Sequence, residues 1–434
     1  MFTKLERLRL NFPECGLPGH QRSAPVPLQA LRPTGIVTNG VLSGVVFRQR
    51  LILVLGVVGA LLSAGYGAMF ALLDDYRDQH GISEGALGYV VGIGFIAGFF
   101  AQLLIAPLAD RGHARKLVVG GLLLYIGGLG AMAASTSLWP LLLSRFTMGI
   151  GVGAAVPAVR RIVILLDPAR LGHNLGLMLA ADVGGFALGP AIASILVGPF
   201  GLAAPYLFIG AAALLFVPVV ARIAVEETAE PPANRFALDL LTHRPFAGAV
   251  VLGCAVFLMI GAFDSLWSLV LDDLHAAEWL ANLGITLFAL PLVVLGSIGG
   301  RLAQRIGPFK VSAIGLAIAS VFMLLYGHMP TAVLMFTVAM VHSLSDGLSV
   351  AAAGVAAGMV VAGDRQAGAQ GVLGGMQTLV AGLSAPLIGS IYQHHGRTVA
   401  YTAAAAMMVA LIIAGLWLAR PAWGIRGTTT PNEV

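Results

Sequence analysis

Three acidic side chains and one imidazole lie inside long apolar stretches of this sequence. Asp182 is near the middle of one stretch and Asp264 is in another, while His342 and Asp346 are four residues apart in a third. A four-residue spacing places two side chains on one face of a helix. A carboxyl group in a medium of low dielectric can bind and release protons near neutral pH, and so can imidazole. We therefore rank Asp182 first, His342–Asp346 second and Asp264 third as proton-binding candidates, with a hydrogen-bonded structural role as the alternative for each.

The apolar stretches that hold these residues dominate the chain. Of 434 residues, 58% are apolar and 10% are charged, whereas roughly 25% of residues are charged in a soluble domain. A helix needs about 20 apolar residues to cross a bilayer. We predict an all-α membrane protein of twelve transmembrane helices in two pseudo-symmetric six-helix halves. The expected spans are 51–73, 86–109, 117–136, 138–160, 173–197, 203–221, 246–270, 280–303, 310–328, 331–361, 368–392 and 398–419.

Basic residues predict the orientation of these spans. Nearly all of the 25 Lys and Arg residues precede the first span, occupy the even-numbered loops or follow the last span. Because cytoplasmic loops are enriched in Lys and Arg, we expect both termini to be cytoplasmic and the protein to be a multi-pass inner (plasma) membrane protein. The basic residues are dispersed, so the net charge of +5 does not indicate nucleic-acid binding. The expected parts are a tail (1–48), a first half (49–222), a central loop (223–245), a second half (246–420) and a short tail (421–434).

Two pairs of similar segments indicate an internal duplication. The hairpin Ala106–Lys116 follows the second span, and a weaker copy, Gly300–Lys310, begins 194 residues later. Gly189-Pro190 in the fifth span is matched by Ala385-Pro386 in the eleventh, offset by 196 residues. The similar offsets predict two homologous halves side by side in the membrane.

Over about residues 50–420, the sequence resembles the major facilitator superfamily, in its drug:proton antiporter-like twelve-helix branch. Leu108, Ala109, Asp110 and Arg111 fit the loop signature of that family, as does Arg115, which Lys116 follows. The signature departs at Ala106, His113 and Ala114, where the family has Gly or Arg. The resemblance implies the major facilitator fold and a gating role for Asp110, Arg111, Arg115, Lys116 and, in the copy, Arg305. The alternative is that the basic residues only set the topology.

Arg145 lies in a fourth span that is similar to the l-x-x-R-x-x-q-G-x-g pattern of this family, with Met148 where Gln is usual. A charge at the centre of a bilayer costs about 2.5–3.5 kcal/mol on insertion scales, so we expect Arg145 to face the protein interior and to find a partner. The resemblance associates it with proton handling. The alternative is an arginine that extends to the outer surface.

Gly185, Gly189 and Pro190 in the fifth span are similar to the antiporter signature g-x-x-x-G-P. Glycine permits close helix contact and proline bends a helix, so these residues and Pro386 are expected to act as a pivot and seal. Ordinary helix packing is the alternative. Candidates for the substrate cavity are, by location, Tyr66, Met69, Phe263, Trp267 and Gln377.

These features predict a secondary transporter that works by alternating access, in which protons drive export of a small amphipathic compound. A proton-coupled symporter or uniporter for a metabolite is an alternative, and so is a non-transporting sensor or scaffold. No G-x-x-x-x-G-K-[ST] loop is present, which argues against an ATP-driven pump. We expect no cofactor besides the proton gradient, no enzyme activity, and a monomer whose partners are the substrate and the lipid bilayer.

Overall fold

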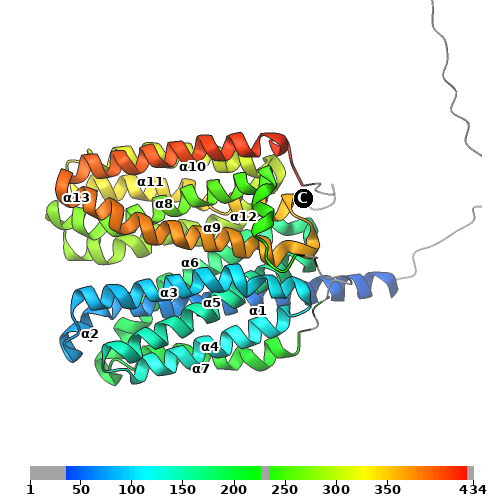
Figure 1. Cartoon of the computed structure of the whole chain (residues 1–434), viewed down its shortest axis with the longest axis horizontal. Helices are drawn as coiled ribbons and strands as arrows, with labels where there is room; N and C mark the ends of the chain where they lie inside the picture. Colours follow the sequence, from blue (N-terminus) through cyan, green and yellow to red (C-terminus); the bar gives the residue numbers. More distant parts are fainter. Residues whose placement is uncertain (1–35, 224, 226–231, 233, 428–434) are drawn as a thin grey trace, which may run out of the picture. The chain divides into compact units, whose positions relative to one another are not determined.

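A computed structural model of the chain describes residues 36–223, 225, 232 and 234–427. The chain divides into two compact units, Met1–Val46 and Phe47–Val434. Helix α1 begins at Ile36, inside the stretch that we expected to be a polar tail. The first 35 residues, and with them most of that tail, lie outside the described residues. The rest of this description concerns the second unit (Figure 1).

Helices form both halves of this unit, which α1 enters at Phe47. The first half contains α1 (Ile36–Ala71), α2 (Leu73–His80), α3 (Glu84–Leu104), η1 (Ala106–Arg111), α4 (Ala114–Ala134), α5 (Leu138–Leu166), η2 (Pro168–Arg170), α6 (Leu171–Phe200) and α7 (Ala204–Ala221). The second half contains η3 (Leu238–Thr242), α8 (Arg244–Asp273), α9 (Glu278–Ile306), α10 (Pro308–Tyr326), α11 (Ala332–Ser349), α12 (Ala352–Val360), η4 (Gly363–Arg365), α13 (Gln366–Ala419) and η5 (Arg420–Ala422). The all-helical class predicted from the sequence is confirmed.

The predicted spans match these helices with two differences. The tenth span is divided between α11 and α12, which are separated by Val350 and Ala351. The eleventh and twelfth spans belong to the long helix α13, which breaks at Gly396 because the φ of this residue is +80°, a conformation that glycine adopts without steric strain. Among the described residues, eleven helical segments are long and apolar enough to cross a membrane, and α13 supplies the last of them.

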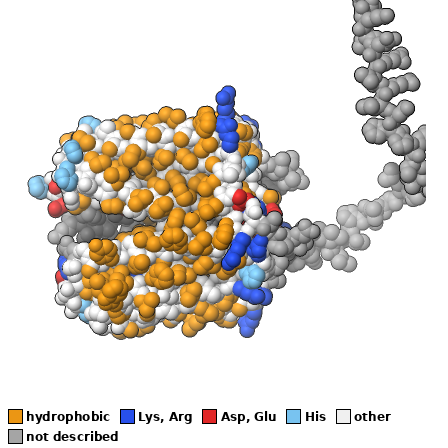
Figure 2. Space-filling model, viewed as in Figure 1, with side chains coloured by type: hydrophobic (Ala, Val, Ile, Leu, Met, Phe, Trp, Pro, Cys, Tyr) orange, Lys and Arg blue, Asp and Glu red, His pale blue; other side chains and the backbone are white. Residues whose placement is uncertain are grey.

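The surface has the polarity expected of a protein in a bilayer. Large apolar side chains such as Trp139, Leu215 and Ile195 are exposed on the flanks, and Figure 2 shows hydrophobic side chains covering the visible flank. Lys and Arg side chains gather at one end of the helices (Figure 2). We call this end, which holds η1, η4 and the start of α6, the basic end. The opposite end holds α2.

Each half has its own apolar core. The first core includes Leu62, Tyr125 and Tyr206, and the second includes Trp267 and Met323. A third, smaller cluster contains residues from the end of α5, the start of α6, the end of α9, the start of α10, and α12. This third cluster lies at the basic end and contains residues of both halves.

Glycines let the halves approach closely at the basic end. A Cβ atom on Gly172 of α6 would overlap the carbonyl oxygen of Gly300 of α9, and one on Gly176 would overlap that of Gly296. Helices α3 and α13 also join the halves, and a Cβ atom on Gly371 of α13 would overlap the carbonyl oxygen of Gln102 of α3. These contacts leave no room for side chains.

From about their middle toward the end that holds α2, helices α6 and α13 pack within their own halves. Gly185 and Gly189 of α6 lie against the backbone of α1. Ser384 of α13 lies against Gly261 of α8. The two halves are therefore joined from the basic end to about the middle of the helices.

We predict that Gly172→Val destabilises the protein, because the new side chain has no space against α9. Overpacking of this kind costs about 1–3 kcal/mol. The readout is the apparent melting temperature of the full chain in detergent micelles. Gly120→Val on α4 is the matched control, since no atom lies within 4 Å of its built Cβ. Equal melting temperatures for the two variants would show that the α6–α9 contact is not tight.

Candidate functional site

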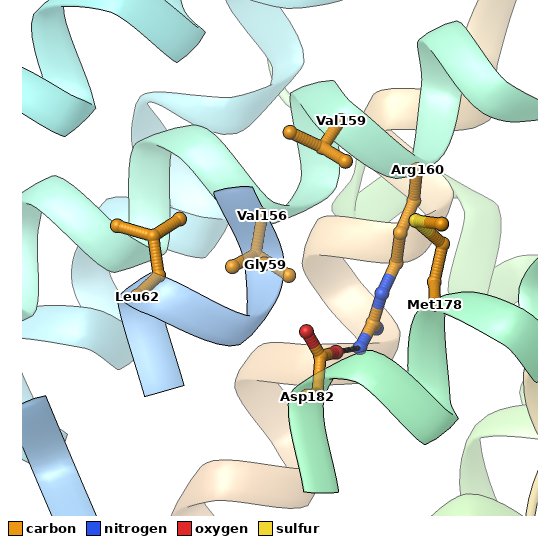
Figure 3. Close-up of a pocket in the computed structure, with 7 residues that line it drawn as sticks. All are labelled: Gly59, Leu62, Val156, Val159, Arg160, Met178 and Asp182. Carbon is orange, nitrogen blue, oxygen red and sulfur yellow. Dashed lines mark hydrogen bonds and ion pairs between the residues drawn. The ribbon is translucent and has the colours of Figure 1, made fainter. Parts of the chain in front are cut away.

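An ion pair lies inside the first half at Asp182, the first-ranked proton-binding candidate. Arg160 of α5 donates from Nη2 to Oδ2 of Asp182 on α6 over 3.2 Å, and both side chains are 22% exposed. Gly59 of α1 makes room for the carboxylate, since a Cβ atom there would lie 2.7 Å from Oδ1. Figure 3 shows both charged groups in a pocket whose other walls include Leu62 and Met178.

Protonation of Asp182 would remove the negative charge from this pair. Inside a membrane protein, an arginine that loses its counter-charge must find another partner or move toward water. Asp182 is eleven residues from the start of α6, so it lies about 17 Å from the basic end of that helix. The pair therefore lies close to the level at which α6 leaves α9.

Arg145 has a different environment in the same half. Its side chain is fully buried, with its Cζ atom 3.8 Å from the centroid of the Tyr66 ring and 5.9 Å from that of Phe95. None of its three guanidinium nitrogens has a hydrogen-bond partner in the described part of the chain. The expected inward orientation is present, but a protein partner is not.

The other two candidates are in the second half. His342 and Asp346 are both buried on α11, with Nε2 and Oδ1 3.4 Å apart, and the Tyr326 hydroxyl lies 2.9 Å from Nδ1 of His342. Phe322 stacks on the imidazole at 4.8 Å. Asp264 is exposed on α8 and forms no hydrogen bond or ion pair with the described residues. The structure thus separates the candidates into three places.

Asp110 connects the two halves at the basic end. Its carboxylate accepts a hydrogen bond from Nε of Arg161 on α5 at 2.9 Å. It also accepts bonds from the backbone amides of Ala367 (2.9 Å) and Gly368 (2.7 Å), in the first turn of α13. An acidic group at a helix N-terminus satisfies amides that have no partner inside the helix and interacts favourably with the helix dipole. Asp110 is therefore an N-terminal cap that reaches from one half to the other.

Gln304, the residue equivalent to Asp110 in the weaker copy, makes the reciprocal contact. Its Oε1 accepts a hydrogen bond from the amide of Gly172 at the start of α6 (2.7 Å), and its Nε2 donates to the carbonyl oxygen of Ala169 (2.9 Å). Gln304 lacks the charge of Asp110, yet both hairpins cap a helix of the opposite half.

The basic residues of the two hairpins differ in their contacts. Arg111 donates to the carbonyl oxygen of Pro232 in the central loop at 2.8 Å. Arg115, Lys116 and Arg305 are exposed, and no hydrogen bond or ion pair joins them to the described residues. Of the expected gating residues, Asp110 thus binds the opposite half and Arg111 binds the central loop.

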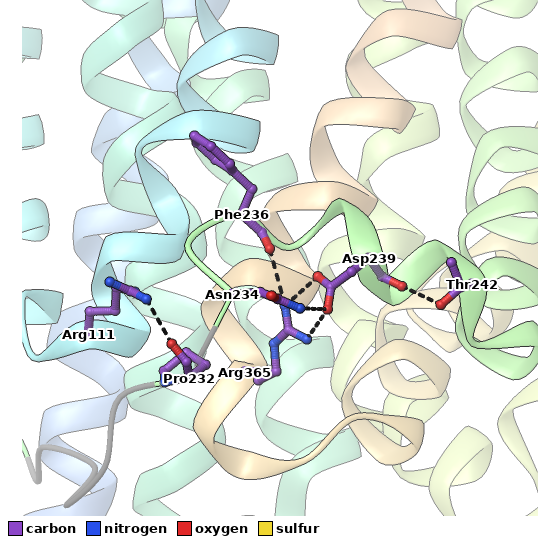
Figure 4. Close-up of polar contacts among 7 residues, drawn as sticks. All are labelled: Arg111, Pro232, Asn234, Phe236, Asp239, Thr242 and Arg365. Carbon is purple, nitrogen blue, oxygen red and sulfur yellow. Dashed lines mark hydrogen bonds and ion pairs between the residues drawn. The ribbon is translucent and has the colours of Figure 1, made fainter.

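An ion pair between Asp239 and Arg365, which we call the Asp239–Arg365 clamp, holds the central loop at the basic end (Figure 4). Nη1 and Nη2 of Arg365 donate to the two carboxylate oxygens of Asp239, each over 2.6 Å. Hydrogen bonds from Arg365 lower the pKa of Asp239 from 3.8 to about 2. Because the pKa is lowered on folding, this clamp contributes fully above about pH 4 and is lost only as the pH falls through about 2. Titration between pH 5 and 8 leaves it unchanged.

The remaining sequence candidates are mostly packing residues. Gly185 and Gly189 lie against α1 of their own half, Pro190 is half-buried beside them, and Pro386 is exposed on α13. Met69, Phe263 and Trp267 are buried in the cores of their halves. Gln377 is buried beside Gly253, while Tyr66 is half-buried and covers Arg145. Their roles as hinge or cavity residues stay predictions.

Comparison with known families identifies the architecture. Residues 52–267 and 249–429 match the Major Facilitator Superfamily. The chain belongs to this family. It is therefore a multi-pass membrane protein of a family of small-molecule transporters, not of enzymes.

Individual relatives of this facilitator are distant. The quinolone resistance protein NorA of Staphylococcus aureus (strain MSSA476) is 25% identical over 224 residues, which are 49% of this chain and 56% of NorA, so the chain spans about half the length of this relative. The human organic anion transporter MFSD10 superimposes with a TM-score of 0.71 at 18% identity, covering 85% of this chain and 99% of MFSD10. The proton:xylose symporter XylE superimposes with a TM-score of 0.70 at 13% identity, covering 88% of this chain and 100% of XylE. These superpositions confirm the predicted fold.

Some residues of the facilitator's polar contacts were not singled out from the sequence. Arg160 and Arg161 were counted only as charges that set the topology, yet one pairs with Asp182 and the other with Asp110. Two adjacent arginines at the end of an apolar run are the sequence signal that could have pointed to buried acidic partners. Asp239 and Arg365 carry no such signal, because they are 126 residues apart in sequence.

We predict that Asp110→Ala and Gln304→Ala each expose the helix that they cap. The amides of Ala367 and Gly368 should exchange faster in Asp110→Ala, and that of Gly172 in Gln304→Ala, because loss of an N-cap costs about 1 kcal/mol. Hydrogen exchange of the protein in lipid nanodiscs measures both effects. Arg305→Ala, at an exposed neighbour of Gln304, should leave both segments unchanged. Unchanged exchange in the cap variants would contradict the reciprocal capping.

Proposed function

We propose that this protein is a proton-coupled transporter that exports a small amphipathic compound by alternating access. The observation that supports this proposal is the Asp182–Arg160 ion pair, which lies within the membrane-spanning helices and lines a pocket. An acid in this position can bind a proton only by giving up its ion pair with arginine. Proton binding therefore changes the interactions between α5 and α6, which form part of the first half.

The orientation follows from the basic end. Lys and Arg favour the cytoplasmic side, so we place this end and both termini in the cytoplasm of a cell bounded by a plasma membrane. The closed contacts at the basic end then make the structure an outward-facing state, as expected when two halves rock around a central site. A proton arriving from outside would reach Asp182 while the cytoplasmic end is closed.

A short series of contacts connects Asp182 with the closed end. Arg160 pairs with Asp182, and the next residue, Arg161, pairs with Asp110. When the proton releases Arg160, the end of α5 can shift and weaken the contact of Arg161 with Asp110. Loss of that contact weakens the cap on α13 and favours opening to the cytoplasm, where the proton leaves.

The direction of transport is supported by the efflux-type relative. NorA is a resistance protein by name, and export in exchange for inward-moving protons fits an outward-facing state that accepts protons. The same fold carries proton symport in XylE, so uptake of a metabolite with protons is the second candidate. A uniporter or a non-transporting sensor would need neither the Asp182–Arg160 ion pair nor a proton on Asp182. We also propose that the transporter is a monomer.

Transport by purified protein in proteoliposomes tests this proposal. A quinolone, ethidium and benzoate serve as probes under an imposed pH gradient. We expect gradient-driven flux of at least one probe, and Asp182→Asn should lose at least about tenfold of that flux, which corresponds to about 1.4 kcal/mol. Asp74→Asn is the control, because its side chain is 81% exposed at the opposite end and pairs with Arg77.

Three results would contradict this account. Flux that ignores the gradient would exclude proton coupling. Normal flux in Asp182→Asn together with loss in Asp346→Asn would move the coupling site to the second half. Absence of flux for every probe would favour the sensor alternative.

A further inference from the structure

The buried guanidinium of Arg145 lacks a partner that physical chemistry requires. Its side chain has no exposed surface, and its three nitrogens make no hydrogen bond within the described residues. No ion pair joins it to a described acidic residue; Asp182 and Asp110 of this half are held by Arg160 and Arg161. A buried charge without a counter-charge costs several kcal/mol. An anion from outside the protein would remove this cost.

The equivalent position in the second half shows what is missing. Arg145 and His342 are 197 residues apart, close to the offsets of the duplicated segments, and each has an aromatic ring beside it: Phe95 at 5.9 Å from Arg145 and Phe288 at 5.7 Å from His342. His342 also has polar partners within its own half, Tyr326 and Asp346. The duplication thus kept the aromatic surroundings in both halves and supplied an internal partner only in the second.

Access to Arg145 depends on Tyr66. The ring of Tyr66 covers the guanidinium at 3.8 Å and is itself half-buried, so its displacement would uncover the charge. The Tyr125 side chain bonds to the backbone of α1 directly beside it. The Tyr125 hydroxyl donates to the carbonyl oxygen of Leu61 (2.8 Å) and accepts from the amide of Gly65 (2.9 Å), the two groups that an α-helix would join to each other. A side chain inserted in this way is a common cause of a local helix bend.

We propose that Arg145 binds the carboxylate of an amphipathic substrate, whose apolar body packs against the rings of Tyr66 and Phe95. A guanidinium presents two parallel N–H groups that match a carboxylate, and the flat aromatic faces suit an apolar body. The site deepens the proposed transport function by naming its substrate class, an organic monocarboxylate. It does not depend on proton coupling.

Binding to the full chain in nanodiscs tests this site without any proton gradient. The probes are benzoate, 2-naphthoate and decanoate, each compared with its uncharged amide, and sodium chloride as an inorganic anion. At constant pH, we expect at least one carboxylate to bind at least about tenfold more tightly than its amide, measured by calorimetry, because a hydrogen bond to a charged group contributes about 1.5–3 kcal/mol. Saturating chloride should not displace it.

Variants identify the group responsible. Arg145→Gln should remove the preference for carboxylate over amide, and Arg145→Lys, which keeps the charge without the planar fork, should reduce it. The matched control is Arg420→Gln, at an exposed arginine in η5. If Arg145→Gln does not fold, the wild-type comparison of acid with amide and the Arg145→Lys variant still decide.

Several outcomes would overturn the proposal. They are equal affinity for acids and amides in the wild type, an unchanged preference in Arg145→Gln or Arg145→Lys, and displacement by chloride, which would indicate a site for inorganic anions only. Carboxylate binding without gradient-driven flux would contradict the proposed proton coupling and leave this site standing. Gradient-driven flux without a carboxylate preference would support proton coupling and contradict the carboxylate site at Arg145.

Discussion

The arrangement of the two halves depends on one hydrogen-bonded carboxylate, that of Asp110. It satisfies two backbone amides at the start of α13 and a buried guanidinium of α5 at the same time. Because these donors belong to different halves, the carboxylate can be satisfied in this way only while the basic end is closed. The contact between Gln304 and the start of α6 repeats the same solution without a charge. Close backbone contacts at Gly172 and Gly371 then fill the remaining space.

The contact between Arg161 and Asp110 also suggests how protonation of Asp182 could act on the closed basic end. Arg160 and Arg161 follow each other on α5 and bind carboxylates at two levels, Asp182 in the pocket and Asp110 at the interface. In the proposed cycle, a change of charge at Asp182 acts on Arg160, whose neighbour Arg161 binds Asp110. The Asp239–Arg365 clamp keeps its charges throughout the neutral range because its carboxyl group has a pKa of about 2. In the proposed cycle it is a constant restraint, which opening would break by movement and not by titration.

Much of this arrangement was predictable from the sequence, and the reasons are physical. Apolar runs of sufficient length predicted the helices, since a bilayer permits few other structures. The repeated hairpin predicted the duplication, and the resemblance to the loop signature of the family drew attention to Asp110. The sequence did not predict partners, because Asp110 binds amides 257 and 258 residues away and backbone amides carry no sequence signal. Nor did it predict that Arg145 would lie buried under Tyr66 without a protein partner, since the packing of side chains between helices has no local pattern.

The central claim is that protonation of Asp182 opens the basic end. Spin labels at positions 115 and 305, exposed on opposite halves, with the native cysteines replaced by serine, report the distance between the halves at that end. We predict a short distance at pH 8 and a longer one at pH 5 for the otherwise wild-type chain. Asp182→Asn, which lacks the charge, should give the longer distance at both pH values. Identical distances at pH 8 and pH 5, or a short distance in Asp182→Asn, would contradict the account.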